Sequence, residues 1–477
     1  MSMMGILDIG SNALSAQRTA LEVTGENVTN INTPGYSRQT VVLETSPGSV
    51  DGQLPVGSGV RVASIQRAHD AFLQAQIQGE SSASGKDTVL NSAMQNIEPL
   101  FNDTAVVGIA TSLQNFFNSW QNLAVNPQGT TERQAVLSNA ETLTSDVQRV
   151  SGSLNDIRLG ANKSLTGITS DISDKLKQIA DLNGQVQAFE VGGASANQLR
   201  DSRDKLLQEL SLKVGVTSRE ESNGMVTVTL GSTSTSAGAM LVEGTKASLL
   251  TVDGNYGNIV LKRTASDAGI DVTPAITADP KSGELGGTLQ VRDKVVPGFL
   301  GKLDEFAYTL ATQVNSAHRT GYNLNNATGV DFFTAAASSS GYSSSIALNV
   351  KSTNEIAAAL SASNDITVTG TGNNQNALAI AALENSSFTV SGSQTTIPGL
   401  YSTLVGNVGS AVQSSQQGVT QSDAMLKQLG TLRESVAGVN LDEELTKLLS
   451  FQKAYEASAK MVATGQTMLD TLLNMVR

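Results

Sequence analysis

Apolar residues recur every seven positions near the amino terminus of the chain. Seven residues make about two helical turns, so this spacing indicates one apolar stripe on a helix of about 25 residues. Ile6, Ala13 and Ala20 stand beside the stripe. The stripe itself consists of Leu7, Leu14, Leu21 and Val28.

A turn motif follows this helix. Proline fixes the first central φ of a type II turn and glycine accepts the positive φ of the second, so Pro34 and Gly35 both end the helix and form such a turn. A strand is expected from Tyr36 to Leu43. The predicted turn residues are Asn32, Thr33, Pro34, Gly35 and Tyr36.

The carboxyl-terminal helix has a predicted start at Asn440. Asn440 can cap the helix, Glu443 can reach back to it, and the acidic run 442–444 stands at the positive end of the helix dipole. Two interleaved heptad seams then run to the end of the chain. The first comprises Leu441, Leu448, Tyr455, Val462, Leu469 and Val476, and the second comprises Leu445, Gln452, Ala459, Gln466 and Leu473.

In the middle of the chain, the spacing of apolar residues changes once, from a helical period to a strand period. Apolar residues keep a helical spacing over 137–189, through three glycines. This spacing predicts one very long helix, which can bend at a glycine. Further helices are expected over 197–210, 291–317 and 401–436, and Asp201 and Lys205 are spaced as an i,i+4 ion pair. Short alternating segments from about 216 onward predict strands instead.

These patterns predict a mainly α protein with an inserted β domain. The helices at the two ends, within 1–65 and 438–477, are expected to pair as a coiled coil. Residues 66–215 and 286–437 are expected to form a long-helix body with an irregular segment at 334–376. Residues 216–285 are expected to form a small β-rich outer domain.

Composition excludes several classes of partner and site. The 477-residue chain has a net charge of −12, which offers no basic surface for nucleic acid or an anionic membrane. It has no run of eighteen apolar residues, so no membrane-spanning segment is expected. The amino terminus has no basic segment ahead of Arg18, so a general secretory signal is not expected either. With no cysteine, disulfides, thiol nucleophiles and cysteine-ligated metals are absent.

The candidate chemical groups favour structural roles. The chain has two histidines, His69 and His318, and neither stands in a metal-ligand pattern. The acidic run 442–444 is expected from the helix dipole alone. Trp120, near Phe116 and Phe117, is expected to anchor a helical core. No catalytic, cofactor-binding or metal site is predicted, and the chain is not expected to be an enzyme.

The terminal stripes predict association instead. An isolated helix of about 25 residues is marginal in water, because packing supplies most helical stability in proteins. Each stripe therefore needs a partner, and both ends are expected to be poorly ordered in a free monomer. The predicted assembly interface comprises Leu7, Leu14, Leu21, Val28, Leu441, Leu445, Leu448, Tyr455, Val462, Leu469 and Leu473.

Both ends also resemble a known family. Residues 27–36, Asn-Val-Thr-Asn-Ile-Asn-Thr-Pro-Gly-Tyr, resemble the amino-terminal signature of bacterial flagellar rod, hook and hook-associated axial proteins, and residues 438–475 resemble their carboxyl-terminal domain. Within that family, the segments 36–39, 283–287 and 329–333 are similar to the hook-associated proteins of the hook-filament junction. Asn326-Ala327 departs from the pattern, since this loop more often carries a glycine.

The resemblance implies a structural, self-assembling subunit at the junction between hook and filament. It also implies secretion through the flagellar type III apparatus without a cleaved signal, and an extracellular position in the flagellum. The implied partners are further copies of the chain, the hook protein, hook-filament junction protein 3 and an export chaperone that binds the carboxyl-terminal region. No cofactor is implied.

Other classes remain open at the level of sequence. Another flagellar axial subunit, of hook or distal rod, would share the terminal helices, and so would a coiled-coil surface adhesin. An enzyme that cleaves the cell wall would need paired carboxylates in a cleft with supporting aromatics. Aromatic residues make up only 4% of the chain, which argues against that class.

Overall fold

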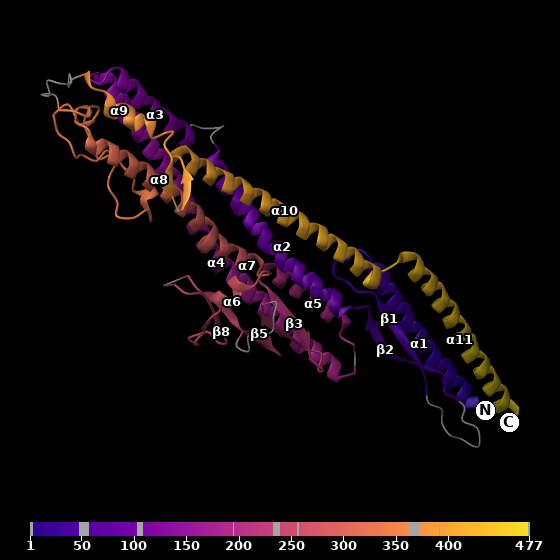
Figure 1. Cartoon of the computed structure of the whole chain (residues 1–477). Helices are drawn as coiled ribbons and strands as arrows, with labels where there is room; N and C mark the ends of the chain where they lie inside the picture. Colours follow the sequence, from indigo (N-terminus) through magenta and orange to yellow (C-terminus); the bar gives the residue numbers. More distant parts are fainter. Residues whose placement is uncertain are drawn as a thin grey trace. The chain divides into compact units, whose positions relative to one another are not determined.

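The structure is a computed structural model that describes residues 3–46, 57–102, 108–193, 195–231, 239–254, 257–362, 372–390 and 392–475. Within these residues the chain is mainly helical, with small antiparallel sheets (Figure 1). It forms two compact units. Unit 1 comprises 1–85, 168–283 and 421–477, and unit 2 comprises 86–167 and 284–420.

The α-helices are α1 (Met3–Thr29), α2 (Ala71–Ile97), α3 (Ile109–Val125), α4 (Thr130–Val191), α5 (Asn197–Lys213), α6 (Thr273–Ala278), α7 (Gly283–Gln290), α8 (Val296–Thr320), α9 (Gln375–Ala382), α10 (Ile397–Ala437) and α11 (Leu441–Met475). Short 3₁₀ turns are η1 (Glu98–Phe101), η3 (Tyr342–Ser344) and η4 (Thr353–Glu355), and η2 (Val291–Val295) is a π-helical turn. The strands are β1 (Gln39–Thr45), β2 (Val60–Arg67), β3 (Val216–Glu220), β4 (Val226–Leu230), β5 (Met240–Glu243), β6 (Lys246–Ala247), β7 (Leu249–Val252), β8 (Ile259–Lys262), β9 (Ile270–Asp271), β10 (Phe388–Val390) and β11 (Ser393–Thr395).

The predicted long helix is confirmed. Helix α4 runs for 62 residues without interruption. Gly152, Gly160 and Gly167 lie inside it, and a Cβ added at any of them would meet no atom within 4 Å. These glycines therefore face open space, where they cost helix stability without serving a close contact. Helix α2 lacked a clear apolar stripe and was not individually predicted.

In unit 1, the inserted strands pack on the second half of α4. The sheets have the orders β3-β4-β5-β6 and β7-β8-β9. Asn183 of α4 donates to the carbonyls of Val226 and Gly244, at 2.8 and 2.7 Å, and its side-chain oxygen accepts from the Val226 amide. The buried side-chain amide of Asn183 thus hydrogen-bonds the inserted strands to α4. Unit 1 contains both these strands and the terminal helices. The division of the chain into a terminal domain, a long-helix body and a β-rich outer domain stays a prediction.

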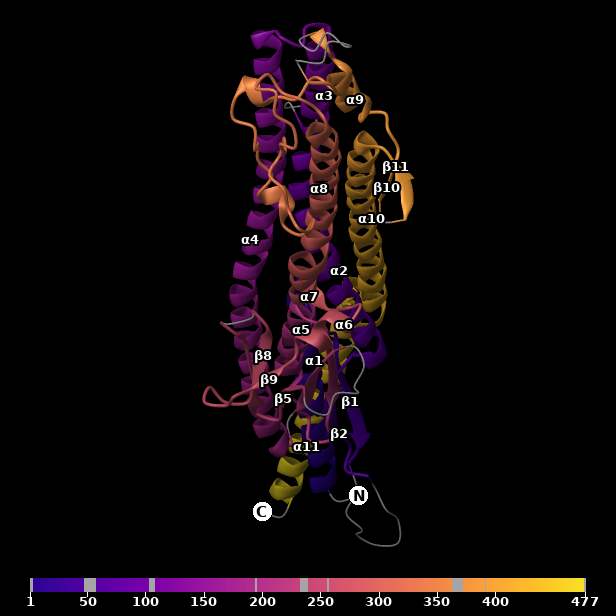
Figure 2. The same cartoon turned by 60° about the vertical axis from the view of Figure 1, so that its left-hand side comes forward.

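In unit 2, α4, α8 and α10 run along one another (Figure 2) around one apolar core. Trp120 is completely buried there, with Phe116 and Phe332 at ring-centroid distances of 6.3 and 5.4 Å. His318 is equally buried, and its two ring nitrogens bond the Val330 carbonyl and the Ala357 amide. Burial lowers the pKa of His318. The core roles expected for Trp120 and His318 are confirmed.

The loop after α8 explains one departure from the family pattern. Asn326 has φ +58°, in the left-handed region that glycine adopts most easily. Asparagine tolerates this region better than other residues do. The Asn326 amide also donates to the Asn323 carbonyl at 3.0 Å, so the turn forms without glycine.

Candidate assembly interface

Helices α1 and α11 pack side by side and antiparallel in unit 1. Leu7 approaches Gly465, Gly10 approaches Val462, and Asn27 bonds Glu444, so residue numbers rise along one helix as they fall along the other. The two chain termini therefore lie at one end of this pair (Figures 1 and 2). The predicted pairing of the terminal helices is confirmed.

Small residues bring the two helices close together. A Cβ added at Gly10 would lie 2.6 Å from Cγ2 of Val462, and one added at Gly465 would lie 3.0 Å from Cδ2 of Leu7. Real Cβ atoms avoid the first distance altogether. Ala16 and Ala20 are also buried on α1. In this contact a larger side chain of each helix lies over a glycine of the other: Val462 over Gly10, and Leu7 over Gly465.

The predicted amino-terminal stripe takes part in this contact through Leu7, which lies over Gly465. Leu7, Leu14, Leu21 and Val28 are all half-buried. The fully buried apolar positions of α1 are Ala16, Ala20 and Val23. The stripe is therefore partly covered within the subunit and keeps surface available to other contacts.

On α11 the first predicted seam is only partly covered. Leu448, Val462 and Leu469 are half-buried, whereas Leu441 and Tyr455 are exposed. Val476 lies outside the described residues.

The second predicted seam does not face α1. Leu445 and Leu473 are 44% and 61% exposed, and Gln452, Ala459 and Gln466 are exposed as well. The buried residues of α11 are Glu444, Ser458 and Gly465. The apolar pattern selects large side chains, but helices that approach this closely need small ones.

Asn27 joins four parts of unit 1. Its side-chain nitrogen donates to the Gln39 carbonyl at 2.8 Å and to Oε2 of Glu444 at 2.9 Å. Its side-chain oxygen accepts from the Tyr36 hydroxyl at 2.8 Å and from the Gln39 amide at 2.9 Å. All four hydrogen-bonding positions of this buried amide are filled. Asn27 thus links α1, the turn, β1 and α11.

Tyr36 and Glu444 complete this cluster. Burial, together with the nearby Glu26 carboxylate, raises the pKa of Tyr36 to about 12. The phenol therefore stays protonated and can donate to Asn27 at any physiological pH. Glu444 is only 1% exposed and accepts from the Lys447 ammonium at 2.7 Å through its other oxygen.

The predicted turn and helix cap are both confirmed. Gly35 has φ +92°, and the Tyr36 amide donates to the Thr33 carbonyl at 3.2 Å, as a type II turn requires. The Asp442 amide donates to Oδ1 of Asn440 at 3.0 Å, which caps α11. Asn32, Thr33 and Pro34 are exposed, whereas Gly35 and Tyr36 are half-buried.

The turn is held from two sides. Arg433 of α10 donates to the Gly35 carbonyl at 2.9 Å, and the Arg38 amide donates to the Ala437 carbonyl at 2.8 Å. Asp201 of α5 accepts from the Ser37 amide at 3.0 Å and from Arg67 at 2.8 Å. The expected Asp201 and Lys205 pair is replaced by this more buried contact with Arg67.

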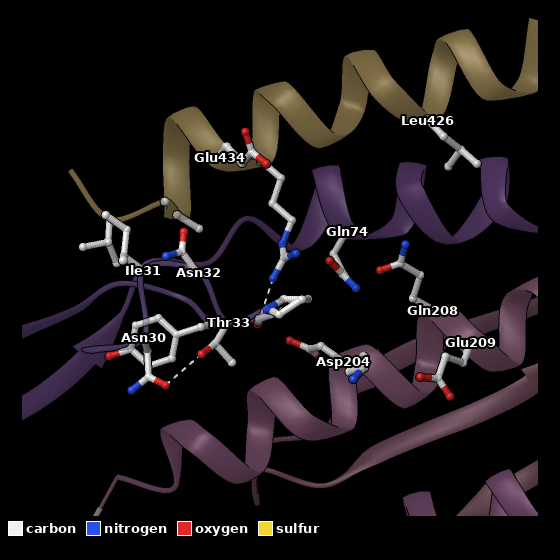
Figure 3. Close-up of a pocket in the computed structure, with 18 of the residues that line it drawn as sticks. Asn30, Ile31, Asn32, Thr33, Gln74, Asp204, Gln208, Glu209, Leu426 and Glu434 are labelled. Carbon is white, nitrogen blue, oxygen red and sulfur yellow. Dashed lines mark hydrogen bonds between the residues drawn. The ribbon is translucent and has the colours of Figure 1, made fainter. Parts of the chain in front are cut away.

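A groove of about 740 Å³ opens beside the turn (Figure 3). Residues 30–36 form one wall, α5 contributes Asp204, Gln208 and Glu209, and α10 contributes Leu426 and Glu434. Asn30 accepts a hydrogen bond from Thr33 at 3.1 Å within that wall. The lining mixes carboxylates, amides and apolar groups with the cations of Lys205 and Arg433.

Exposed apolar side chains gather on α11. They are Leu441, Leu445, Leu449, Tyr455, Met461, Met468, Leu472, Leu473 and Met475. An exposed apolar surface of this extent usually marks an interaction site. No helix in the described ranges has the length and apolar content needed to cross a membrane. Among those same residues, no cluster of three or more histidines and carboxylates could hold a metal ion.

Comparison with known proteins matches three segments to flagellar families. Residues 94–333, half of the chain, match "Flagellar hook-associated protein FlgK helical domain". Residues 7–36 match "Flagella basal body rod protein", and residues 433–475 match "Flagellar basal body rod FlgEFG protein C-terminal". The last two segments contain α1 with its turn, and α11.

Whole proteins match over nearly the full length. "Flagellar hook-associated protein 1" of Bacillus subtilis (strain 168) is 28% identical over 98% of this chain and 97% of its own length. The protein of that name from Salmonella typhimurium is 26% identical over 99% and 100%. The solved structure of the flagellar hook junction protein FlgK from Burkholderia pseudomallei shares the fold, with a TM-score of 0.65 and 18% identity over 76% of this chain and 100% of that one.

Proposed function

This chain belongs to the flagellar hook-associated protein FlgK family, and we propose on that basis that it assembles as the junction between hook and filament. Its family makes it a structural component of the flagellum. The proposal adds the position in the flagellum and the mode of assembly, through contacts between the terminal helices of neighbouring copies.

The exposed apolar surface of α11 is the observation that carries this proposal. Leu445 and Leu473 lie on a helix whose other face is already packed against α1, so their exposure leaves apolar area for a further partner. Burying one leucine completely is worth roughly 1.5 to 3 kcal/mol. Several such residues on each copy favour association of many copies.

The proposed interface retains the residues expected from the sequence. Leu7, Leu14, Leu21 and Val28 have half-covered side chains that neighbouring copies can bury further. Leu441, Leu445, Tyr455 and Leu473 are exposed, and Leu448, Val462 and Leu469 are half-buried. The turn residues 32–36 act indirectly, by fixing α1 and α11 in one geometry.

The proposed partners follow from the proposed position. A junction subunit contacts hook protein on one side and hook-filament junction protein 3 on the other. Before assembly, an export chaperone covers the exposed apolar side of α11 near the carboxyl terminus, and the chain leaves the cell through the flagellar type III apparatus. The net charge of −12 offers no basic surface for nucleic acid or an anionic membrane.

Immunogold labelling of isolated flagella tests the position. An antibody is raised against residues 216–285, the inserted strands, so that it does not compete with the terminal helices. The proposal expects one narrow gold band at the tip of the hook. Label along the whole hook, along the rod or over the general cell surface contradicts the proposed junction role and favours another axial subunit or an adhesin.

A further inference from the structure

Eight of the nine exposed apolar residues of α11 form two separate stripes, and Leu473 lies outside both. We define the proximal stripe as Leu441, Leu445, Leu449 and Tyr455, which are 38% to 59% exposed. We define the distal stripe as Met461, Met468, Leu472 and Met475, which are 45% to 78% exposed. The first occupies the amino-terminal half of the helix and the second the carboxyl-terminal half.

The two stripes lie on opposite sides of the contact with α1. That contact is marked by the buried residues Glu444, Ser458 and Gly465. With about 100° of rotation per residue, the proximal stripe is centred about 110° to one side of it and the distal stripe about 80° to the other. The apolar surface therefore changes sides halfway along α11.

A polar ridge separates the stripes on the outward face of the helix. Exposed residues along this ridge are Asp442, Lys453, Lys460, Thr464, Thr467 and Thr471. In the half opposite each stripe, the same side is small or polar except at Leu473, which is exposed on the proximal side of the second half. Ser450 and Ala457 stand on the distal side of the first half, and Ala463 and Gln466 stand on the proximal side of the second half. One continuous partner along α11 would not bury both stripes.

We propose that the proximal stripe of one copy packs against the distal stripe of the next copy, with the two α11 helices parallel and staggered. The inference rests on the proposed function, since it specifies how neighbouring copies meet. The stripe centres are 20 residues apart, so the pairing sets a stagger of about 30 Å at about 1.5 Å per residue.

A second copy of the chain is the partner that fits both stripes. A repeating head-to-tail contact requires each copy to present a surface and its complement, and α11 carries two unlike apolar surfaces continuous with the α1 contact. Methionine side chains adapt their shape, so the distal stripe can accept the leucines of the proximal stripe.

The charged residues that border the two stripes support the same stagger of 20 residues. Asp442 borders the proximal stripe on its ridge side, and Lys460 borders the distal stripe on its ridge side. A stagger of 20 residues places Asp442 of one copy beside position 462 of the next, about one helical turn or less from Lys460. The opposite charges then lie together at the edge of the apolar contact.

Cysteine cross-linking tests the pairing, because the chain has no native cysteine. The full-length chain carrying both Leu449→Cys and Met468→Cys replaces the native chain in cells, and isolated flagella are oxidised and analysed by immunoblot. The two positions are about 28 Å apart on one helix, beyond disulfide reach within a copy. The proposal expects a ladder of cross-linked multimers, since each copy links to two neighbours.

Matched variants serve as controls for the cross-linking result. Ser450→Cys with Asp470→Cys lies at similar heights on the opposite sides of α11 and is expected to give no ladder. Leu449→Cys alone is expected to stay monomeric. Dimers from that single variant would overturn the pairing of unlike stripes. A chain that enters flagella but never cross-links overturns the inference and leaves the junction role standing, whereas absence of the unmodified chain from flagella overturns both.

Discussion

At the scale of single residues, the side chain of Asn27 makes four hydrogen bonds in unit 1. It is the point at which α1, the turn, β1 and α11 share hydrogen bonds, and it faces the buried carboxylate of Glu444. A buried carboxylate that loses a donor bears an uncompensated desolvation cost. The geometry of the terminal helices therefore depends on one amide side chain.

Replacement of Asn27 by alanine is expected to destabilise unit 1 by roughly 2 to 4 kcal/mol, because buried partners lose their hydrogen bonds. Urea unfolding followed by far-ultraviolet circular dichroism measures the change. Asn30→Ala is the control, since Asn30 bonds only neighbouring groups on a more exposed surface, the Glu26 carbonyl and the Thr33 hydroxyl. Equal losses in the two variants would contradict the role given to Asn27.

Gly10 sets how closely α1 and α11 approach. We expect Gly10→Ala to cost about 1 to 3 kcal/mol through overpacking against Val462, less the gain in helix propensity. Gly25→Ala is the matched control on the same helix, because a Cβ there meets no atom within 4 Å, and it is expected to be neutral or stabilising. Adding Val462→Ala should recover much of the loss. Stabilisation by Gly10→Ala alone would show that the helices are not in close contact.

At the scale of elements, α11 is weakly held by its own subunit. Three of its residues are buried, whereas α4 buries a long series that includes Leu143, Val147 and Ile172. Local opening is easiest where few apolar contacts are buried. The second half of α11 should therefore be ordered mainly by assembly.

Hydrogen exchange measures this difference directly. In the free chain, amides of 461–475 are expected to exchange much faster than those of 140–180 in α4, and to become protected in isolated flagella. The inserted-strand segment 226–230 serves as an internal reference whose protection assembly should leave unchanged. Protection of α11 equal to that of α4 in the dilute monomer would contradict the expectation that the chain ends are poorly ordered before assembly.

The elements also show what the sequence could and could not predict. Helix α4, the turn at Gly35 and the Asn440 cap follow from local rules of spacing, φ and hydrogen bonding, and each was predicted correctly. The predicted stripes contain Leu7 and Val462, which lie in the contact between α1 and α11, but spacing could not identify Gly10 and Gly465 opposite them, because glycine carries no apolar signal. The partners of Asn27 and Asp201 come from segments distant in sequence, so spacing could not identify them.

At the scale of the whole molecule, the chain combines two compact units with a carboxyl-terminal helix that exposes apolar surface. Trp120 lies in the core of unit 2, and it is the single tryptophan, so its fluorescence reports whether unit 2 is folded. A substitution on α11 that leaves the Trp120 fluorescence unchanged but removes the chain from flagella would impair assembly without unfolding unit 2. We propose that the terminal helices form the assembly interface.

Leu448→Asp tests that claim most directly, because it places a charge on the half-buried, apolar side of α11. Ser450→Asp is the control on an exposed polar position of the same turn. The measurement is the amount of each variant in purified hook structures by immunoblot, with Trp120 fluorescence verifying a folded unit 2. The account predicts that Ser450→Asp is retained and Leu448→Asp is lost from the hooks. Equal amounts of both variants in the hooks would contradict it.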